Sequence, residues 1–232
     1  MEHIGEEKDL GVHVDCDLKF EIHIAEKIKK ANAMLGLIQR SFTSLSADIV
    51  MPLYKCFVRH HLENNAAVWG GNLSRPQIDA IEKVQMRATA MIEGMKEMEY
   101  SSRLEQLKLP TLVYRRARGR MIEVWRHFHT HDAAVARPMF ELAVSQRHPL
   151  QIRRGPVLYK HRSVQANSFY HFAPLGYNLL YKDTRTSENM DTFKARLDRE
   201  WKDSPILYDY KKLLTHINTR RDTNTETGLQ ED

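Results

Sequence analysis

Apolar residues that recur every three or four positions are the feature that most limits how this chain can fold. Between positions 22 and 40 their spacings are four, three, four and three. The residues are Ile24, Ile28, Ala31, Leu35 and Ile38. Because an α-helix completes a turn in about 3.6 residues, these side chains share one face of an amphipathic helix. The pattern predicts a helix from Ile22 to near Arg40 that packs against other helices.

Two further helices are predicted on the same grounds. The first starts at a cap provided by Ser44 or Ser46, and Pro52 falls in its first turn, where a missing N–H costs little. Its inward residues are Ile49, Leu53, Phe57 and Val58. The second follows a break at Gly70-Gly71-Asn72. Its inward residues are Ile78, Ile81, Val84, Ala88 and Met91.

A short helix and a long one complete the regular pattern. The short helix starts at Ser101 or Ser102 and stops at Leu109-Pro110, and Thr111 can cap the long one. The inward face of the long helix carries Leu112, Ala117, Met121, Val124 and Phe128.

The ends of the chain differ from this helical middle. Residues 10–14 alternate between apolar and other side chains, and the acidic turn Asp15-Cys16-Asp17 follows, which predicts the second half of a β-hairpin whose partner lies upstream. We therefore expect a mainly α fold with a β element at 1–20, a helical region at 21–130 and a disordered tail at 215–232. Between them, 131–214 reads as a basic, irregular region with a terminal helix near Asp191–Trp201.

Composition narrows the class of protein. The chain has two cysteines without C-x-x-C spacing, no signal-peptide pattern at its start and no run of 18 apolar residues. These features predict a soluble intracellular protein and leave nucleus and cytoplasm open. The histidines around His127 and His129 are more typical of a helix end than of a metal site, and Cys56 is expected in the core.

Positive charge gathers in the middle of the chain, whose net charge is +5 overall. Residues 75–130 hold 11 basic and 7 acidic side chains, and 131–180 hold 6 and 2, so each segment carries +4. Arginines near the start of the long helix oppose its dipole, and a phosphate partner would offset that cost. The predicted nucleic-acid-binding residues are Lys29, Lys30, Lys55, Arg59, Lys83, Arg87, Arg115, Arg116, Arg118 and Arg120. We expect these side chains to be exposed and several of them to line one groove.

An ordered series of short motifs carries a family resemblance. It runs from Lys8–Val12 and Asp15–Phe20 through Lys29–Gly36, then Tyr54–Arg59, and on to the motifs that follow. Those are Leu62–Trp69, Ile81–Thr89, Leu104–Leu112, Tyr114–Arg116 and Phe193–Trp201. The series resembles the region downstream of the polymerase core in reverse transcriptases of non-LTR (LINE-like, jockey-type) retrotransposons. The resemblance implies the end of the palm, then the helical thumb that grips the template–primer duplex, here RNA–DNA or RNA.

The catalytic part of such an enzyme is not expected in this chain. The family uses Mg²⁺ held by carboxylates in a Phe/Tyr-x-Asp-Asp turn, and this sequence contains no Asp-Asp pair. Asp15 and Asp17 read as a polar turn that caps a strand. The chain alone is therefore predicted to have no catalytic, metal or cofactor site, and an upstream polymerase domain could belong to a longer product.

Two alternatives remain open at this stage. The family carries a Trp-Asn-x-Leu-Pro motif for which the nearest equivalent here is Tyr177-Asn178-Leu179-Leu180. This departure favours a decayed reading frame with no selected activity, or with a role only in protein interaction. The other alternative is that this chain forms one part of a longer, active reverse transcriptase whose upstream part is missing here.

Overall fold

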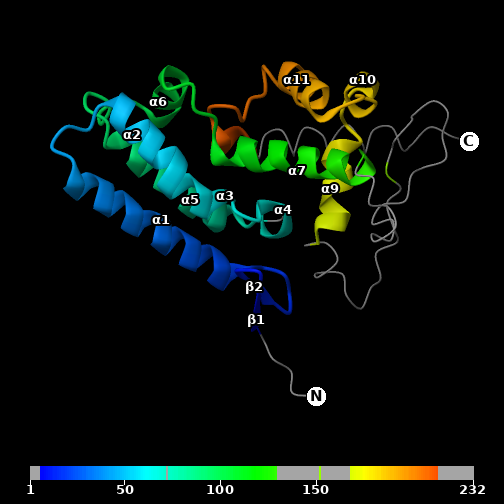
Figure 1. Cartoon of the computed structure of the whole chain (residues 1–232), viewed down its shortest axis with the longest axis horizontal. Coiled ribbons are helices and arrows are strands. Elements are labelled where there is room, and N and C mark those ends of the chain that lie inside the picture. The colour runs from blue at the N-terminus through cyan, green and yellow to red at the C-terminus, as the bar shows by residue number, and fades with distance from the viewer. Residues whose placement is uncertain (1–5, 72, 130–151, 153–167, 214–232) are drawn as a thin grey trace, which may run out of the picture.

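The chain is mainly helical, with one small antiparallel sheet at its N-terminal end (Figure 1). The structure, a computed structural model, describes residues 6–71, 73–129, 152 and 168–213. The predicted fold class is confirmed by these elements. The predicted tail at 215–232 and most of the irregular stretch 131–167 lie outside the described residues.

The sheet is a hairpin of β1 (Glu6–Asp9) and β2 (Val12–Asp15). Leu10 and Gly11 form its two-residue turn with positive φ angles of 44° and 80°, as tight hairpin turns require. The prediction of a second hairpin strand with an upstream partner is confirmed, and the partner β1 immediately precedes the turn. Its sequence, Glu-Glu-Lys-Asp, is polar throughout and therefore shows no strand alternation.

The first helix, α1 (Glu21–Ser41), agrees with the prediction from periodicity. Ile24, Ala31, Leu35 and Ile38 are buried, and Ile28 packs against the core as a partly buried residue. The stripe faces the helices that follow in the chain, and the hairpin lies beside the start of α1 (Figure 1).

The second predicted helix is interrupted by a π-helical turn. It consists of α2 (Ala47–Leu53), the turn η1 (Tyr54–Val58) and α3 (Arg59–Glu63). Pro52 is the sixth residue of α2 and not in its first turn, so it removes a hydrogen bond inside the helix just before η1.

This turn changes which side chains face the core. Phe57 was expected inside but is 49% exposed, and Cys56 was expected to be a core thiol but is exposed. Tyr54 and Val58 are buried in their place. A π-turn accommodates an additional residue, so a regular 3.6-residue period assigns the wrong face here.

Helices α4 (Ala66–Trp69), α5 (Arg75–Ala90), α6 (Tyr100–Gln106) and α7 (Leu112–His129) follow. Ser74 and Gln77 form a capping box at the start of α5. The Thr111 hydroxyl accepts a hydrogen bond from the Tyr114 N–H at 3.0 Å, so the predicted cap of α7 is confirmed. The α6 helix begins one residue before the predicted serines, after Glu99.

The last described elements are α9 (Phe169–Tyr177), α10 (Lys182–Arg185), α11 (Met190–Glu200) and the short turn η3 (Tyr210–Lys212). Residues 168–176 were expected to be irregular, but they form most of α9 despite Pro174. The terminal helix is confirmed as α11, and its Phe193 and Leu197 are fully buried.

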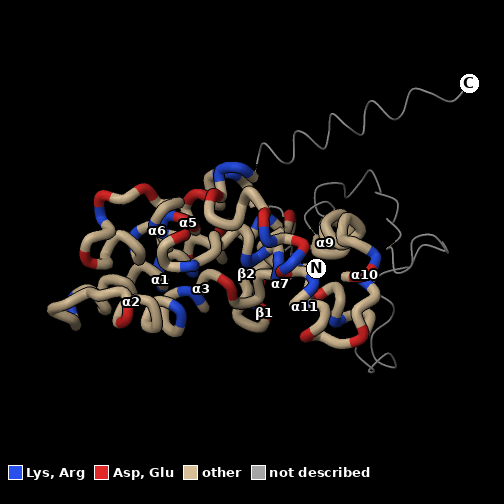
Figure 2. The backbone as a smooth tube through the Cα atoms, turned by 90° about the horizontal axis from the view of Figure 1, so that it is seen from above, with Lys and Arg blue, Asp and Glu red and all other residues tan. Residues whose placement is uncertain are grey.

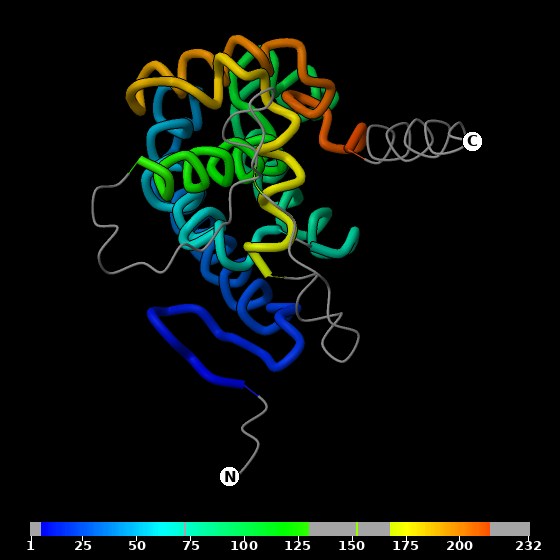
Figure 3. Tube along the Cα trace, turned by 90° about the vertical axis from the view of Figure 1, so that its right-hand side faces the viewer, coloured from blue at the N-terminus to red at the C-terminus, as the bar shows by residue number. Residues whose placement is uncertain are grey.

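Two apolar clusters meet along α7. Leu112 at its start joins the cluster built on α1, η1, α5 and α6, whereas Met121, Val124 and Trp125 belong to a second cluster with α9 and α11. Figures 1 and 3 show α7 between these groups of helices, with α9 crossing it. The α7 helix therefore connects both parts of the core.

Candidate nucleic-acid interface

Six of the ten predicted binding residues lie outside α7, and most of them are exposed. Lys29, Lys55 and Lys83 are exposed on α1, η1 and α5. The others already have partners: Lys30 lies 2.6 Å from Glu26, Arg59 lies 3.6 Å from Glu63, and Arg87 donates to Asn32 at 2.9 Å. The exposure prediction fails for Arg59, whose side chain is only 18% exposed.

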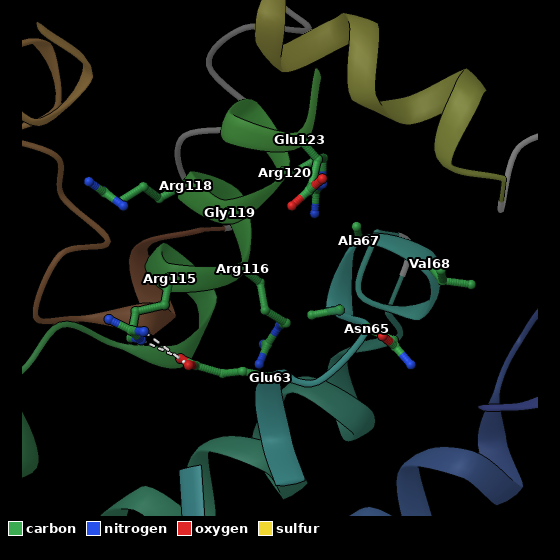
Figure 4. A pocket seen from close by; sticks show the side chains of 11 residues that line it. Glu63, Asn65, Ala67, Val68, Arg115, Arg116, Arg118, Gly119, Arg120 and Glu123 are labelled. Carbon is green, nitrogen blue, oxygen red and sulfur yellow. Dashed lines mark hydrogen bonds and ion pairs between the residues drawn. The ribbon is translucent and has the colours of Figure 1, made fainter. Parts of the chain in front are cut away.

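The four predicted arginines of α7 line one pocket of about 460 Å³ (Figure 4). Its opposite wall comes from the end of α3 and from α4. The lining includes Glu63 and Glu123 beside Arg115, Arg116, Arg118 and Arg120, so four positive and two negative side chains give a net charge of +2. The sequence prediction that several of these cations share one groove agrees with this arrangement.

Two of these arginines are held by carboxylates. Nη2 of Arg115 donates to Oε2 of Glu63 at 2.9 Å, and its Nε bonds the other oxygen. Arg118 makes the same bidentate contact with Asp198 of α11, at 2.6 and 2.8 Å. These hydrogen bonds raise the pKa of both arginines above the usual range. The expectation of free, exposed guanidinium groups is therefore wrong for this pair.

Of the other two, Arg116 is buried and Arg120 is half-buried, so neither is exposed as predicted. Arg116 is only 6% exposed, and burial lowers its pKa although Glu82 partly offsets this. Arg120 Nη2 donates to the Gly70 carbonyl at 3.1 Å, and its guanidinium lies 4.6 Å from the centre of the Phe172 ring. Burial, followed by the like charge of Arg116, lowers the pKa of Arg120 to about 10.

A buried carboxylate of α5 lies against the first turn of α7. It offsets the cost of placing arginines near this helix start, which had suggested a phosphate partner. Oε1 of Glu82 accepts the Val113 N–H at 2.9 Å, and the Tyr100 hydroxyl donates to Oε2 at 2.8 Å. Gln85 extends this network: it accepts from Tyr54 at 2.6 Å and donates to the Tyr100 hydroxyl at 3.0 Å. The Ile81–Thr89 motif therefore has an internal, structural role.

The glycines between α4 and α5 permit the close packing of this region. A Cβ atom on Gly70 would lie 3.0 Å from Cδ of Arg116, and one on Gly71 would lie 1.6 Å from the Phe172 ring. A Cβ on Gly119, in the pocket wall, would meet no atom within 4 Å. The predicted break therefore also lets Arg116 of α7 approach Gly70 and Phe172 of α9 approach Gly71.

Asp15 and Asp17 do not form a metal site. The Asp15 carboxylate accepts the backbone N–H groups of Asp17, Lys19 and Phe20 at 3.1, 2.9 and 2.5 Å, and Asp17 lies 3.2 Å from the Lys19 ammonium. The turn-capping interpretation is confirmed, because the Asp15 carboxylate accepts three backbone N–H groups of its own turn. Across the described ranges, no group of three or more His, Cys, Asp or Glu side chains could hold a metal ion.

Positions of both charge signs occur along the described part of the chain. Basic and acidic positions are interspersed along the described helices (Figure 2). His129 stacks on Trp125 with ring centroids 3.9 Å apart, in keeping with a helix-end role. None of the described helices is both long enough and apolar enough to cross a membrane.

The residues that sequence reasoning missed are mostly the partners of the arginines. Glu63 and Asp198 are 52 and 80 residues from the arginines they bind, beyond any local pattern. A signal was available for Arg116 and Arg120, because both follow Leu112 at intervals of four and so lie in line with the apolar stripe. Comparison of the chain with protein-family models, curated proteins and solved structures gives no match.

Proposed function

We propose that this chain is a nucleic-acid-binding helical module, similar in role to the thumb of a non-LTR retrotransposon reverse transcriptase. In this role it binds an RNA–DNA or RNA duplex through phosphate contacts that do not depend on base sequence. The chemistry of polymerisation would have to come from another part of a longer product.

One observation carries the proposal: four arginines selected from the sequence as phosphate contacts line a single pocket with a net charge of +2. Lys29 on α1, Lys55 on η1 and Lys83 on α5 are exposed and supply further cations that can meet a phosphate backbone. The ordered motifs support the same assignment, although the internal network of Glu82 and Gln85 accounts for part of their pattern.

The test compares two variants with the same reduction in charge. In the first, Lys29, Lys55 and Lys83 are replaced by Gln, and in the second the exposed Lys96, Lys202 and Lys211 are replaced by Gln. Binding of a labelled RNA–DNA hybrid is measured by fluorescence anisotropy between 50 and 200 mM salt, taken as roughly the useful range for phosphate contacts.

The wild type is expected to bind with a steep salt dependence. The first variant should lower the slope of log K against log salt by about 0.7–0.9 for each phosphate that the protein no longer neutralises, whereas the second should leave it unchanged. Equal effects in both variants would mean that net charge alone drives binding, and absence of binding at low salt would refute the proposal outright.

A further inference from the structure

The pocket beside α7 contains buried donors that the described part of the chain leaves unused. Nη1 of Arg116 and Nε of Arg120 are both buried and have no hydrogen-bond partner among the described residues. Nearly all buried polar groups in native proteins have a partner, in protein, water or ligand. Two such donors, on neighbouring arginines that both line one pocket, therefore point to an external acceptor.

Both carboxylates that line the pocket are already hydrogen-bonded to arginines other than Arg116 and Arg120. Glu63 is bound bidentately by Arg115, and both oxygens of Glu123 accept from Nη1 of Arg126, at 2.8 and 3.0 Å. Among the described residues, no acidic group lies close enough to Arg120 to raise its pKa, and the charge that acts on it is the positive one of Arg116. The charge balance around Arg120 thus favours an added anion, whereas Arg116 is already under the influence of the Glu82 and Glu63 carboxylates.

The shape of the pocket leaves room for that anion. Figure 4 shows Arg116 pointing from α7 toward the end of α3, while Arg118 points away from the space between the helices. Ala67 lies on the α4 side, the Asn65 side chain points away from Arg116, and Gly119 leaves open space where a side chain would stand.

We propose that this pocket binds one phosphate group, with Arg116 and Arg120 as the donors and with Arg115 and Arg118 held back by their own carboxylates. Guanidinium groups suit phosphate because their planar array of N–H donors matches its oxygens. The phosphate can belong to a nucleic-acid backbone, in which case the inference rests on the proposed function, or to a free phosphate compound.

Gly119 offers a test that leaves the arginines in place. Gly119→Glu puts a carboxylate at the pocket wall, and Gly119→Gln is its neutral match in size. Both replace a helical glycine by a better helix former, so both variants should fold. Inorganic phosphate is titrated against the full chain at constant ionic strength, and binding is followed by the rise in Tm and by the NMR signals of the arginine Nε–H groups.

The wild type should be stabilised by phosphate, and Gly119→Glu should bind it about tenfold more weakly than Gly119→Gln, owing to repulsion between like charges. No phosphate response in the wild type, or equal responses in the two variants, would overturn the inference. Hybrid binding measured on the same variants separates the two claims. If the hybrid still binds all three proteins while phosphate binds none, the pocket inference fails and the proposed function stands.

The two sources of phosphate are distinguished by the same data. If Gly119→Glu weakens both phosphate and hybrid, the pocket takes a backbone phosphate. If it weakens phosphate alone, the pocket takes a free phosphate compound and the duplex is bound elsewhere on the protein.

Discussion

The carboxylate of Glu82, in the middle of α5, accepts the backbone N–H of Val113 in the first turn of α7 at 2.9 Å. The first N–H groups of a helix have no partner within the helix, so a side chain from a different helix satisfies this one. The contact is fully buried, and burial raises the pKa of Glu82, although Arg116 and the hydrogen bonds from Tyr100 and the backbone oppose this shift. This hydrogen bond connects the start of α7 to the middle of α5.

Removal of this carboxylate should destabilise the whole fold. Glu82→Ala leaves the Val113 N–H and the Tyr100 hydroxyl without their acceptor in a buried site, which should lower the free energy of unfolding by about 1–3 kcal/mol. Urea denaturation measures the decrease. Glu105→Ala, at an exposed position of α6, is the control and should change stability by less than about 0.5 kcal/mol. Equal effects would show that the buried contact contributes nothing.

Gly71 should tolerate no side chain, because its Cβ would lie 1.6 Å from the Phe172 ring. Gly71→Ala forces α9 to shift and should lower the free energy of unfolding by about 1–3 kcal/mol. Gly119→Ala, with open space around its Cβ, should be neutral or stabilising by up to about 1 kcal/mol. A Gly71→Ala protein as stable as Gly119→Ala would contradict the close approach of α9.

Asn178 should hold Ile152 in place. Its Oδ1 accepts the Ile152 N–H at 2.9 Å, and its Nδ2 donates to the Ile152 carbonyl at 3.0 Å. Asn178→Ala removes both hydrogen bonds, and the amide of Ile152 should exchange its hydrogen faster, by about tenfold for each 1.4 kcal/mol by which local stability falls. Asn178→Asp keeps the acceptor and should protect this amide better. Unchanged exchange in the alanine variant would show that the bridge is absent in solution.

The stability of the N-terminal part should fall in mild acid through His23. Its Nδ1 accepts the His13 N–H at 3.3 Å, and its ring lies 5.6 Å from that of Trp69. Burial, with the positive charge of Lys27 next, lowers the pKa of His23 to about 4 from 6.5. Because the unfolded state binds the proton more readily, this stability is complete above pH 6.5 and is lost as the pH falls toward 4.

The expected size of this effect can be measured by urea denaturation at two pH values. Lowering the pH from 7 to 5 should decrease the free energy of unfolding by about 2 kcal/mol through the protonation of His23. His23→Asn keeps an acceptor for the His13 N–H and does not titrate, so it should lose less stability over the same interval. Other groups near His23, including Glu26 and Lys30, are the same in both proteins. Identical pH dependence would exclude a role for His23.

Much of the helical architecture could be predicted from the sequence, since periodicity depends only on neighbours within a few turns. The stripes of α1, α5 and α7 follow from it, as do the Thr111 cap and the N-terminal position of Ser46 before α2, although the Ser46 side chain makes no capping hydrogen bond. The period failed at Phe57, where Pro52 and the π-turn change the face that is buried. It also failed at α9, whose Pro174 suggested a loop although the helix contains it.

The candidate site was harder to predict, because exposure of a charged side chain depends on distant partners. Arg115 and Arg118 were assigned to solvent, yet Glu63 and Asp198 reach them from other helices. Arg116 was also assigned to solvent, but its position four residues after the buried Leu112 turns it inward. The prediction that several of the cations line one groove agrees with the four arginines of α7, since these residues share one helix.

The division of the core into two clusters joined by α7 gives the protein its own optical reporters. The chain has three tryptophans. Trp69 lies in the first cluster, Trp125 lies in the second, and Trp201 packs at the edge of the second. Variants that keep only Trp69 or only Trp125 would therefore emit fluorescence from one half of the molecule at a time. Coincident unfolding curves would show that α7 makes both halves a single cooperative unit, and separate curves would show which half opens first.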